Sequence, residues 1–330
     1  MIVFRGLIIL IFAAALAQFV TAQDDDPIRV DSSIVRLNVG VADARGRPVT
    51  NLRQSNFEIY EDGVKQQIMR FEPVDTPFSV VIMLDMSGST LGFRQVIRLS
   101  AVRFIDALGP NDRVAVVEFY DKINLRNDFT TDRNTIANSI SVAEGRGKTQ
   151  FYKALNFALD KLAKEKSRRK AIIVLTDGVD SDVKEQDRAI LEPLKQPEDI
   201  ATALKPENSS VLNRVLNRSD AQGVTIYPLA LPTGDPDKLA DPTERQLAMF
   251  RVARSRLQLI ADRTGGTLNT INRLEEMARL YAVVAADLRT LYTIEYQPDN
   301  EKRDGKWRSI RIDVKDPDLI SRTRQGYYAK

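Results

Sequence analysis

Two residue types are missing from the 330 residues of this chain: cysteine and histidine. Without cysteine, the chain can form no disulfide and can offer no thiolate as a nucleophile or metal ligand. Without histidine, it lacks the commonest general base of enzymes and the usual ligand of zinc and iron. A Ser–His–Asp triad cannot be built from this sequence, so hydrolases of that type are excluded.

The net charge and the hydrophobic content of the chain are moderate. The hydrophobic content is 43%, which suffices for ordinary globular cores and argues against bulk disorder. The formal net charge is only +3, and basic residues are interspersed with acidic ones. A nucleic-acid-binding protein would gather its basic residues in a patch, so we expect no nucleic acid partner. The length is compatible with two domains.

Residues 1–22 have the pattern of a secretory signal peptide. Arg5 precedes an apolar run from Gly6 to Val20, and the small residue Ala22 ends the segment. We therefore expect a secreted protein, or one of the periplasm or cell envelope, with no membrane span in the mature chain. The apolar run approaches the length that crosses a bilayer, so an uncleaved N-terminal membrane anchor is the alternative.

Alternating patterns predict short antiparallel strands in an N-terminal flank, residues 23–76, and a C-terminal flank, residues 292–330. The apolar stripe of the first strand consists of Ile34, Leu37, Val39 and Val41. A hairpin turn is predicted at Glu61–Gly63, with 67–71 as its return strand. Each flank is too short to bury a core alone, so we expect the two to pair into one β-sandwich. Two separate hairpins packed on the central part are the alternative.

Between the flanks, residues 77–291 alternate apolar strand-like runs with helical spacing. Strands are predicted at 79–85, 112–120, 170–176 and 223–231, with helices between them. This order is typical of an α/β domain with a mainly parallel sheet covered by helices on both faces. The polar stretch 182–222 predicts only one or two short surface helices. We expect the α/β domain to be inserted in the flanking β-sandwich.

Oxygen-bearing side chains gather where the predicted parallel strands end. Asp85 ends the first apolar run, and Ser87 and Ser89 follow it. Thr149 lies in a loop before a helix, and Asp177 ends another apolar run. Because ligands bind at the carboxyl edge of such sheets, we expect these side chains to converge there. Carboxylate and hydroxyl oxygens suit Mg²⁺ or Mn²⁺ rather than zinc or copper.

Helix capping and phosphate binding are two other possible roles for residues in these segments. Ser and Asp residues after a strand can cap the following helix, and this is how we interpret Asp180 and Ser181. The sequence Gly147–Thr149 looks like the end of a phosphate-binding loop. Val142 stands where such a loop requires glycine, which argues against that function.

In order and spacing, the five residues resemble the metal-ion-dependent adhesion site of the von Willebrand factor type A domain family. That motif is Asp-x-Ser-x-Ser, then a Thr and then an Asp, and here it would be formed by Asp85, Ser87, Ser89, Thr149 and Asp177. The resemblance covers residues 77–291, and the layout is similar to a subgroup of exported bacterial proteins. It implies a Rossmann-like fold that holds Mg²⁺ or Mn²⁺, with an acidic side chain of a protein partner as the final ligand.

Taken together, these features imply an exported module for metal-dependent protein–protein interaction or adhesion, and not an enzyme. One alternative is a structural envelope module whose metal only stabilises the fold. A metal-assisted hydrolase is less favoured, because no general base can be nominated.

Overall fold

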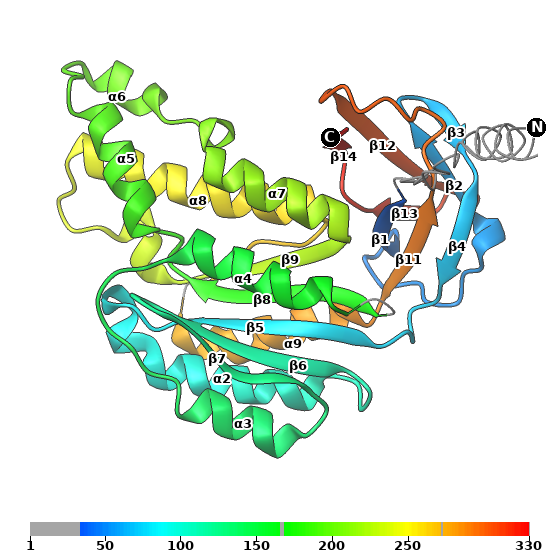
Figure 1. Cartoon of the computed structure of the whole chain (residues 1–330), viewed down its shortest axis with the longest axis horizontal. Helices are drawn as coiled ribbons and strands as arrows, with labels where there is room; N and C mark the ends of the chain where they lie inside the picture. The colour runs from blue at the N-terminus through cyan, green and yellow to red at the C-terminus, as the bar shows by residue number, and fades with distance from the viewer. Residues whose placement is uncertain (1–33, 166–167, 272, 330) are drawn as a thin grey trace, which may run out of the picture. The chain divides into compact units, whose positions relative to one another are not determined.

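The computed structural model describes residues 34–165, 168–271 and 273–329 (Figure 1). The predicted signal peptide, residues 1–22, lies outside the described residues. Within the described part of the chain, no helix is both long enough and apolar enough to cross a membrane.

A six-stranded sheet forms the centre of the α/β part (Figure 1). In spatial order its strands are β10 (Asn269–Thr270), β9 (Val224–Ala230), β8 (Arg169–Thr176), β5 (Phe78–Asp85), β6 (Arg113–Phe119) and β7 (Ile123–Thr130). Only the edge strand β7 runs antiparallel to its neighbour in this sheet, and the other strands pair in parallel. Every residue of β5 and β8 is buried, as expected for parallel strands with helices on both faces.

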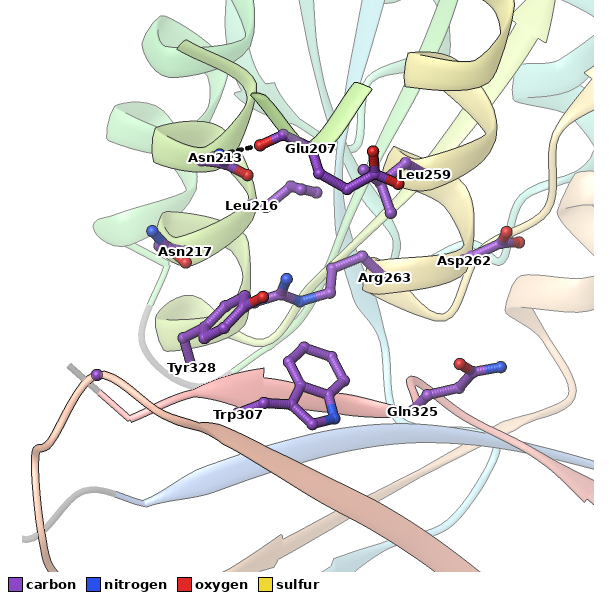
Figure 2. A pocket seen from close by; sticks show the side chains of 11 residues that line it. Glu207, Asn213, Leu216, Asn217, Leu259, Asp262, Arg263, Trp307, Gln325 and Tyr328 are labelled. Atoms are coloured by element: carbon purple, nitrogen blue, oxygen red, sulfur yellow. Dashed lines mark hydrogen bonds between the residues drawn. The ribbon is translucent and has the colours of Figure 1, made fainter. Parts of the chain in front are cut away.

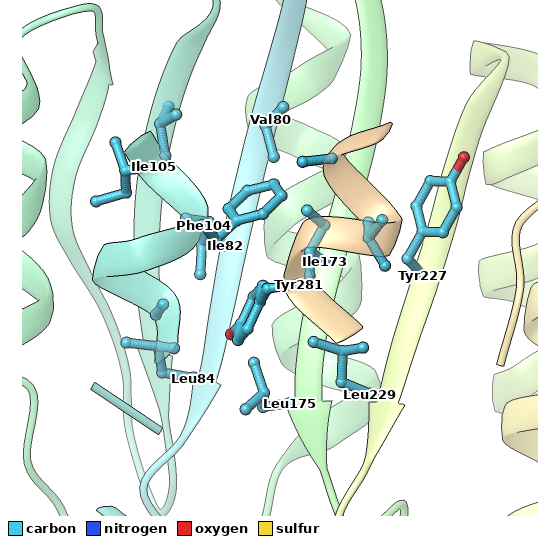
Figure 3. Packing of buried hydrophobic residues seen from close by; sticks show 14 of the residues in the cluster. Val80, Ile82, Leu84, Phe104, Ile105, Ile173, Leu175, Tyr227, Leu229 and Tyr281 are labelled. Atoms are coloured by element: carbon cyan, nitrogen blue, oxygen red, sulfur yellow. The ribbon is translucent and has the colours of Figure 1, made fainter. Parts of the chain in front are cut away.

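Helices cover both faces of this sheet. One face packs against α2 (Arg94–Ala107), α3 (Arg133–Ser141) and α9 (Met277–Leu288), and the other against α4 (Phe151–Ala163), α5 (Ser181–Leu191), α7 (Ser210–Gln222) and α8 (Glu244–Thr264). Successive side chains of β5 alternate between these layers, Ile82 facing the first and Val81 the second. Figure 3 shows the first layer, where the rings of Phe104 and Tyr281 lie 5.3 Å apart over the strands. The predicted mainly parallel α/β fold is confirmed.

Strands from the two ends of the described chain pair in two antiparallel four-stranded sheets. The first consists of β13 (Leu319–Arg322), β1 (Val35–Asp43), β11 (Leu291–Tyr296) and β4 (Ile68–Glu72), and the second of β14 (Gly326–Tyr328), β12 (Trp307–Val314), β2 (Phe57–Glu61) and β3 (Val64–Gln66). Strand β1 pairs with β11, and β2 pairs with β12, so each sheet combines both flanks. Buried side chains of the two sheets, such as Leu37 and Ile59, share one core. That 23–76 and 292–330 form a domain independent of 77–291 stays a prediction.

The structure corrects two details of the N-terminal flank. The hairpin turn lies where predicted, with positive φ angles of 48° at Asp62 and 82° at Gly63. Its return strand, however, is β3, whereas Ile68–Glu72 crosses to the other sheet and pairs with β11. Ile34 is 48% exposed, because the residues of β1 that face the core start at Val35.

The polar stretch 182–222 contains more buried structure than predicted. It forms α5, α6 (Pro197–Ala203) and α7, and α7 buries Leu212, Val215 and Leu216 in the core on one face of the sheet. A narrow apolar stripe among many polar residues hides this role in the sequence. Helix α3 was not predicted, since it contributes only Ile136 and Ile140 to the core. Short 3₁₀ helices complete the fold at Gln54–Asn56, Gly88–Phe93, Pro206–Asn208, Pro232–Gly234, Pro236–Lys238 and Leu274–Glu276.

Candidate metal-binding site

The two predicted carboxylates stand at the ends of adjacent parallel strands. Asp85 is the last residue of β5, and Asp177 directly follows β8. The strands pair in register, with Leu84 opposite Leu175. The chain continues from β5 to β6 on one side and from β8 to β9 on the other, so the space between β5 and β8 is a topological switch point. Open α/β sheets bind their ligands at such a point.

Asp85 is completely buried, and two neighbours orient its carboxylate. Its Oδ1 accepts a 3.1 Å hydrogen bond from the backbone N–H of Ser87, and its Oδ2 accepts a 2.8 Å bond from the hydroxyl of Thr176. The hydroxyl of Thr90 donates to the backbone carbonyl of Asp85 at 2.8 Å. Sequence analysis missed Thr176, although its position directly before Asp177 at the end of a buried strand was a usable signal.

Two serines lie between the carboxylates. The hydroxyl of Ser87 is buried and lies 3.3 Å from that of Ser89. Ser89 is exposed, and its hydroxyl lies beside the carboxylate of Asp177. The backbone N–H of Val179 donates to Oδ1 of Asp177 at 3.0 Å. Four of the five predicted residues therefore form one contiguous group of oxygen atoms.

Thr149 joins this group through its loop. The N–H of Gly88 donates to the carbonyl of Gly147 at 3.0 Å, which brings the loop containing Thr149 against the serine loop. In the described part of the chain, the hydrogen bonds of Thr149 go to Ser181 rather than to either carboxylate. Its N–H donates to the Ser181 hydroxyl at 2.9 Å, and its carbonyl accepts from the Ser181 N–H at 2.9 Å. Thr149 itself is 6% exposed, so its side chain is largely buried beside the site.

The predicted role of Asp180 as a cap of the following helix, α5, is confirmed. Its carboxylate accepts hydrogen bonds from the backbone N–H groups of Asp182 at 3.0 Å and Val183 at 3.1 Å, at the start of α5. Ser181 has a different role, since its hydroxyl holds the loop of Thr149.

Arg94, a second residue that sequence analysis missed, holds the two loops together. Its guanidinium donates to the carbonyl of Met86 at 2.9 Å and also to the carbonyl of Gly145. These contacts join the loop after β5 to the loop before α4. Because the bonds of Arg94 go to backbone oxygens, the guanidinium positions the site without pairing with its carboxylates.

Charge is poorly compensated at this site. Burial raises the pKa of Asp85, and the negative charge of Asp177 raises it further. Burial likewise raises the pKa of Asp177. No Lys or Arg of the described residues forms an ion pair with either carboxylate. Two buried carboxylates without an ion-pair partner are unfavourable, and a divalent metal ion would compensate both.

The donor set fits a hard cation. Two carboxylates and three hydroxyls offer only oxygen, as Mg²⁺ and Mn²⁺ prefer. Among the described residues, no cluster of three or more Asp or Glu side chains forms a metal cage. A cation held here would therefore depend on neutral hydroxyls for part of its shell, and it would keep electrophilic character towards a further anionic ligand.

Part of the sequence matches a known protein family. Residues 80–179 match the family model of the von Willebrand factor type A domain, and this segment contains all five site residues. No curated protein sequence matches the chain.

Solved structures of similar proteins come from several organisms. The von Willebrand factor domain of the type V pilus tip protein Mfa5 from Porphyromonas gingivalis is 16% identical, with a TM-score of 0.47, covering 64% of this chain and 94% of that one. A von Willebrand factor type A protein from Catenulispora acidiphila is 14% identical, with a TM-score of 0.48, covering 92% and 64%. Proximal thread matrix protein 1 of the mussel byssus, with a zinc-occupied MIDAS motif, is 15% identical, with a TM-score of 0.46, covering 68% and 48%. Residues 80–179, in the fold that contains them, therefore belong to a von Willebrand factor type A domain.

Proposed function

We propose that this protein is an exported module for metal-dependent protein–protein interaction or adhesion. Asp85, Ser87, Ser89, Thr149 and Asp177 hold Mg²⁺ or Mn²⁺, and a carboxylate of a protein partner completes the coordination. One observation carries this proposal: two buried carboxylates meet serine hydroxyls at the switch point of the sheet, with no ion-pair partner among the described residues.

The donor set explains why a partner would be needed. Mg²⁺ prefers octahedral coordination by oxygen and readily keeps a water or takes an external oxygen ligand. Five side chains leave one octahedral position open for such a ligand. Ser89 is exposed, so the site is reachable from solvent on that side. An acidic side chain of a partner supplies both the missing oxygen and a favourable charge.

Direct titration tests the metal site. Calorimetry with Mg²⁺ and with Mn²⁺ should show saturable binding to the wild-type protein and none to Asp85→Ala. A suitable control is Asp182→Asn, because Asp182 is an exposed carboxylate whose partner is Lys153. This control should bind the metal like the wild type. Equal Mg²⁺ affinity in wild type and Asp85→Ala would refute the proposed site.

Partner capture tests the function itself. Proteins from an envelope extract that bind the immobilised wild-type chain in Mg²⁺ should be released by EDTA and should not bind Asp85→Ala. If the metal instead stabilises the fold only, the melting temperature will depend on Mg²⁺ while capture does not. A screen with ester and phosphoester substrates addresses the hydrolase alternative, for which no base is evident.

Export is proposed from the N-terminal sequence. A secreted or periplasmic product should start after Ala22 when the full chain is expressed in a bacterium and the mature protein is sequenced from its N-terminus. Recovery of the intact chain from the membrane fraction would support the alternative, an uncleaved anchor.

A further inference from the structure

A pocket of about 460 Å³ lies between helices α7 and α8 and the second antiparallel sheet (Figure 2). Helix α8 follows β9 and leads to the parallel strand β10, so its last turn lies at the amino edge of the central sheet. Arg263, in that turn, lines the pocket. The candidate metal site lies at the opposite, carboxyl edge. The pocket is therefore a separate site, and its volume is in the range of about 300–1,000 Å³ that is usual for small-molecule sites.

Two aromatic rings form one wall of this pocket. Trp307, the single tryptophan of the chain, is 38% exposed, and Tyr328 is 43% exposed. Their ring centroids lie 5.2 Å apart at an interplanar angle of 70°. Large aromatic side chains are usually covered in a folded protein, so an exposed edge-to-face pair in a concave site is informative.

A buried ion network holds these rings in place. Figure 2 shows Arg263 reaching towards both rings, and its guanidinium carbon lies 4.6 Å from the centroid of Trp307 and 4.8 Å from that of Tyr328. Arg263 is only 8% exposed and forms a 2.6 Å ion pair with Asp220, which also pairs with Arg324 at 3.0 Å. The aromatic wall is thus fixed before any ligand arrives, which lowers the entropic cost of binding.

The polar side chains that line the pocket supply both donors and acceptors of hydrogen bonds. Asn213 and Asn217 of α7 and Gln325 carry amides, and Glu207 and Asp262 carry carboxylates. Amides both donate and accept hydrogen bonds, whereas carboxylates only accept them. Asn213 already donates to the backbone carbonyl of Glu207 at 2.7 Å, so its amide is oriented.

The charged side chains that line the pocket limit the chemical class of ligand that it can bind. The carboxylates of Glu207 and Asp262 would repel an anion. An organic cation packed on the rings would lie close to the positive charge of Arg263, whose guanidinium carbon is within 5 Å of both ring centroids. A neutral ligand with many hydroxyl groups and one apolar face is repelled by neither charge, and it can pack on the parts of the two rings that remain exposed beside Arg263. Sugars have this character, because the C–H face of a pyranose packs on an aromatic ring while its hydroxyls bond to amides and carboxylates.

We propose that this pocket binds a neutral carbohydrate of about disaccharide size. One pyranose packs on Trp307 and Tyr328, and its hydroxyls bond to Asn217, Gln325 and Asp262. The proposal is independent of the metal site, and it would give the protein a glycan ligand in addition to a protein partner.

Fluorescence of the single tryptophan tests this proposal directly, because the entire tryptophan signal comes from the pocket. The full chain is titrated with maltose, cellobiose and N,N′-diacetylchitobiose, with and without EDTA. We expect a saturable change in the emission of Trp307 with at least one disaccharide, unaffected by EDTA. Absence of saturable change with all three at millimolar concentration would overturn the proposal, as would binding of tetramethylammonium but of no sugar.

Variants separate recognition from packing. Asn217→Ala and Asp262→Ala keep the fluorescent residue and should weaken sugar binding about tenfold or more, as expected when a buried hydrogen bond is lost. Tyr60→Ala is the matched control, because Arg311 lies 4.1 Å from the Tyr60 ring in a similar arrangement outside the pocket. It should bind the sugar like the wild type. If Asn217→Ala and Asp262→Ala bind with unchanged affinity, the sugar is not bound in this pocket and the proposal fails.

Discussion

The hydroxyl of Thr176 donates a 2.8 Å hydrogen bond to Oδ2 of Asp85, across the pair of strands β8 and β5. Both side chains are completely buried. This bond fixes the rotation of the Asp85 carboxylate, whose other oxygen accepts the N–H of Ser87. Thr176 is therefore a positioning residue for the proposed metal site: it acts through Asp85 and is not itself a ligand.

Replacing Thr176 by valine should weaken metal binding without unfolding the protein. The two side chains have nearly the same shape, but valine cannot donate a hydrogen bond to Asp85. Loss of a residue that orients a metal ligand typically reduces affinity by about 10- to 100-fold. Calorimetry with Mg²⁺ measures this effect, and Thr176→Ser should restore most of the affinity. Wild-type affinity in Thr176→Val would show that the bond has no role in binding.

The melting temperature of Asp85→Asn should not respond to metal, unlike that of the wild type. Without metal, the variant removes a buried charge that Asp177 repels, so we expect it to melt higher than the wild type. With saturating Mg²⁺, only the wild type should rise, because only its folded state binds the ion. Differential scanning calorimetry in EDTA and in Mg²⁺ measures the melting temperatures of the two proteins without and with the metal. An equal Mg²⁺-dependent rise in the two proteins would place the ion elsewhere.

Arg169 should be essential for the junction between the central sheet and the antiparallel sheets. It is 2% exposed, and its guanidinium donates to the carbonyls of Thr76 and Val74 at 2.7 Å each, and also to that of Leu291. Burial lowers its pKa to about 10, so it remains charged at neutral pH. Arg169→Met leaves these carbonyls without a donor, and we expect a loss of about 3 kcal/mol in the free energy of unfolding.

Urea denaturation measures this loss. Arg188→Met is the control, because Arg188 forms an exposed ion pair with Glu185 within α5. Such pairs contribute little, so the control should change the free energy by less than about 0.5 kcal/mol. A similar small change in Arg169→Met would mean that water replaces the lost donor.

Residues 77–291 should fold without the flanks if the predicted domain division is right. A chain truncated to this range keeps the whole central sheet and all the residues of the proposed metal site. It loses the contacts that Asn38 and Arg324 of the flanks make with Thr225 and Asp220, so we expect a lower melting temperature but one cooperative transition and retained Mg²⁺ binding. Circular dichroism and calorimetry check this. A truncated chain without a cooperative transition would indicate a single folding unit.

The sequence by itself determined the central sheet and the position of the candidate site. Apolar runs such as that ending at Asp85 are long enough to specify buried strands, and chain direction then places their ends. Since parallel strands present all carboxyl ends at one edge, Asp85 and Asp177 had to lie near each other once their strands were neighbours. The alternation in β12, with every second residue buried from Arg308 to Ile312, was equally local and was also predicted correctly.

Only the tertiary structure decided features that depend on pairing between distant segments. Local periodicity shows which residues share a face, but it does not show which strand or helix that face will meet. For this reason the crossing of Ile68–Glu72 to the sheet of β11 was missed, and so were the contact of Thr176 with Asp85 and the burial of α7. The aromatic wall of the pocket is the clearest case. It joins Arg263 of α8 to Trp307 of β12. Helix α9 lies between these two residues in the sequence, and only long-range packing brings the guanidinium carbon of Arg263 within 5 Å of the Trp307 ring centroid.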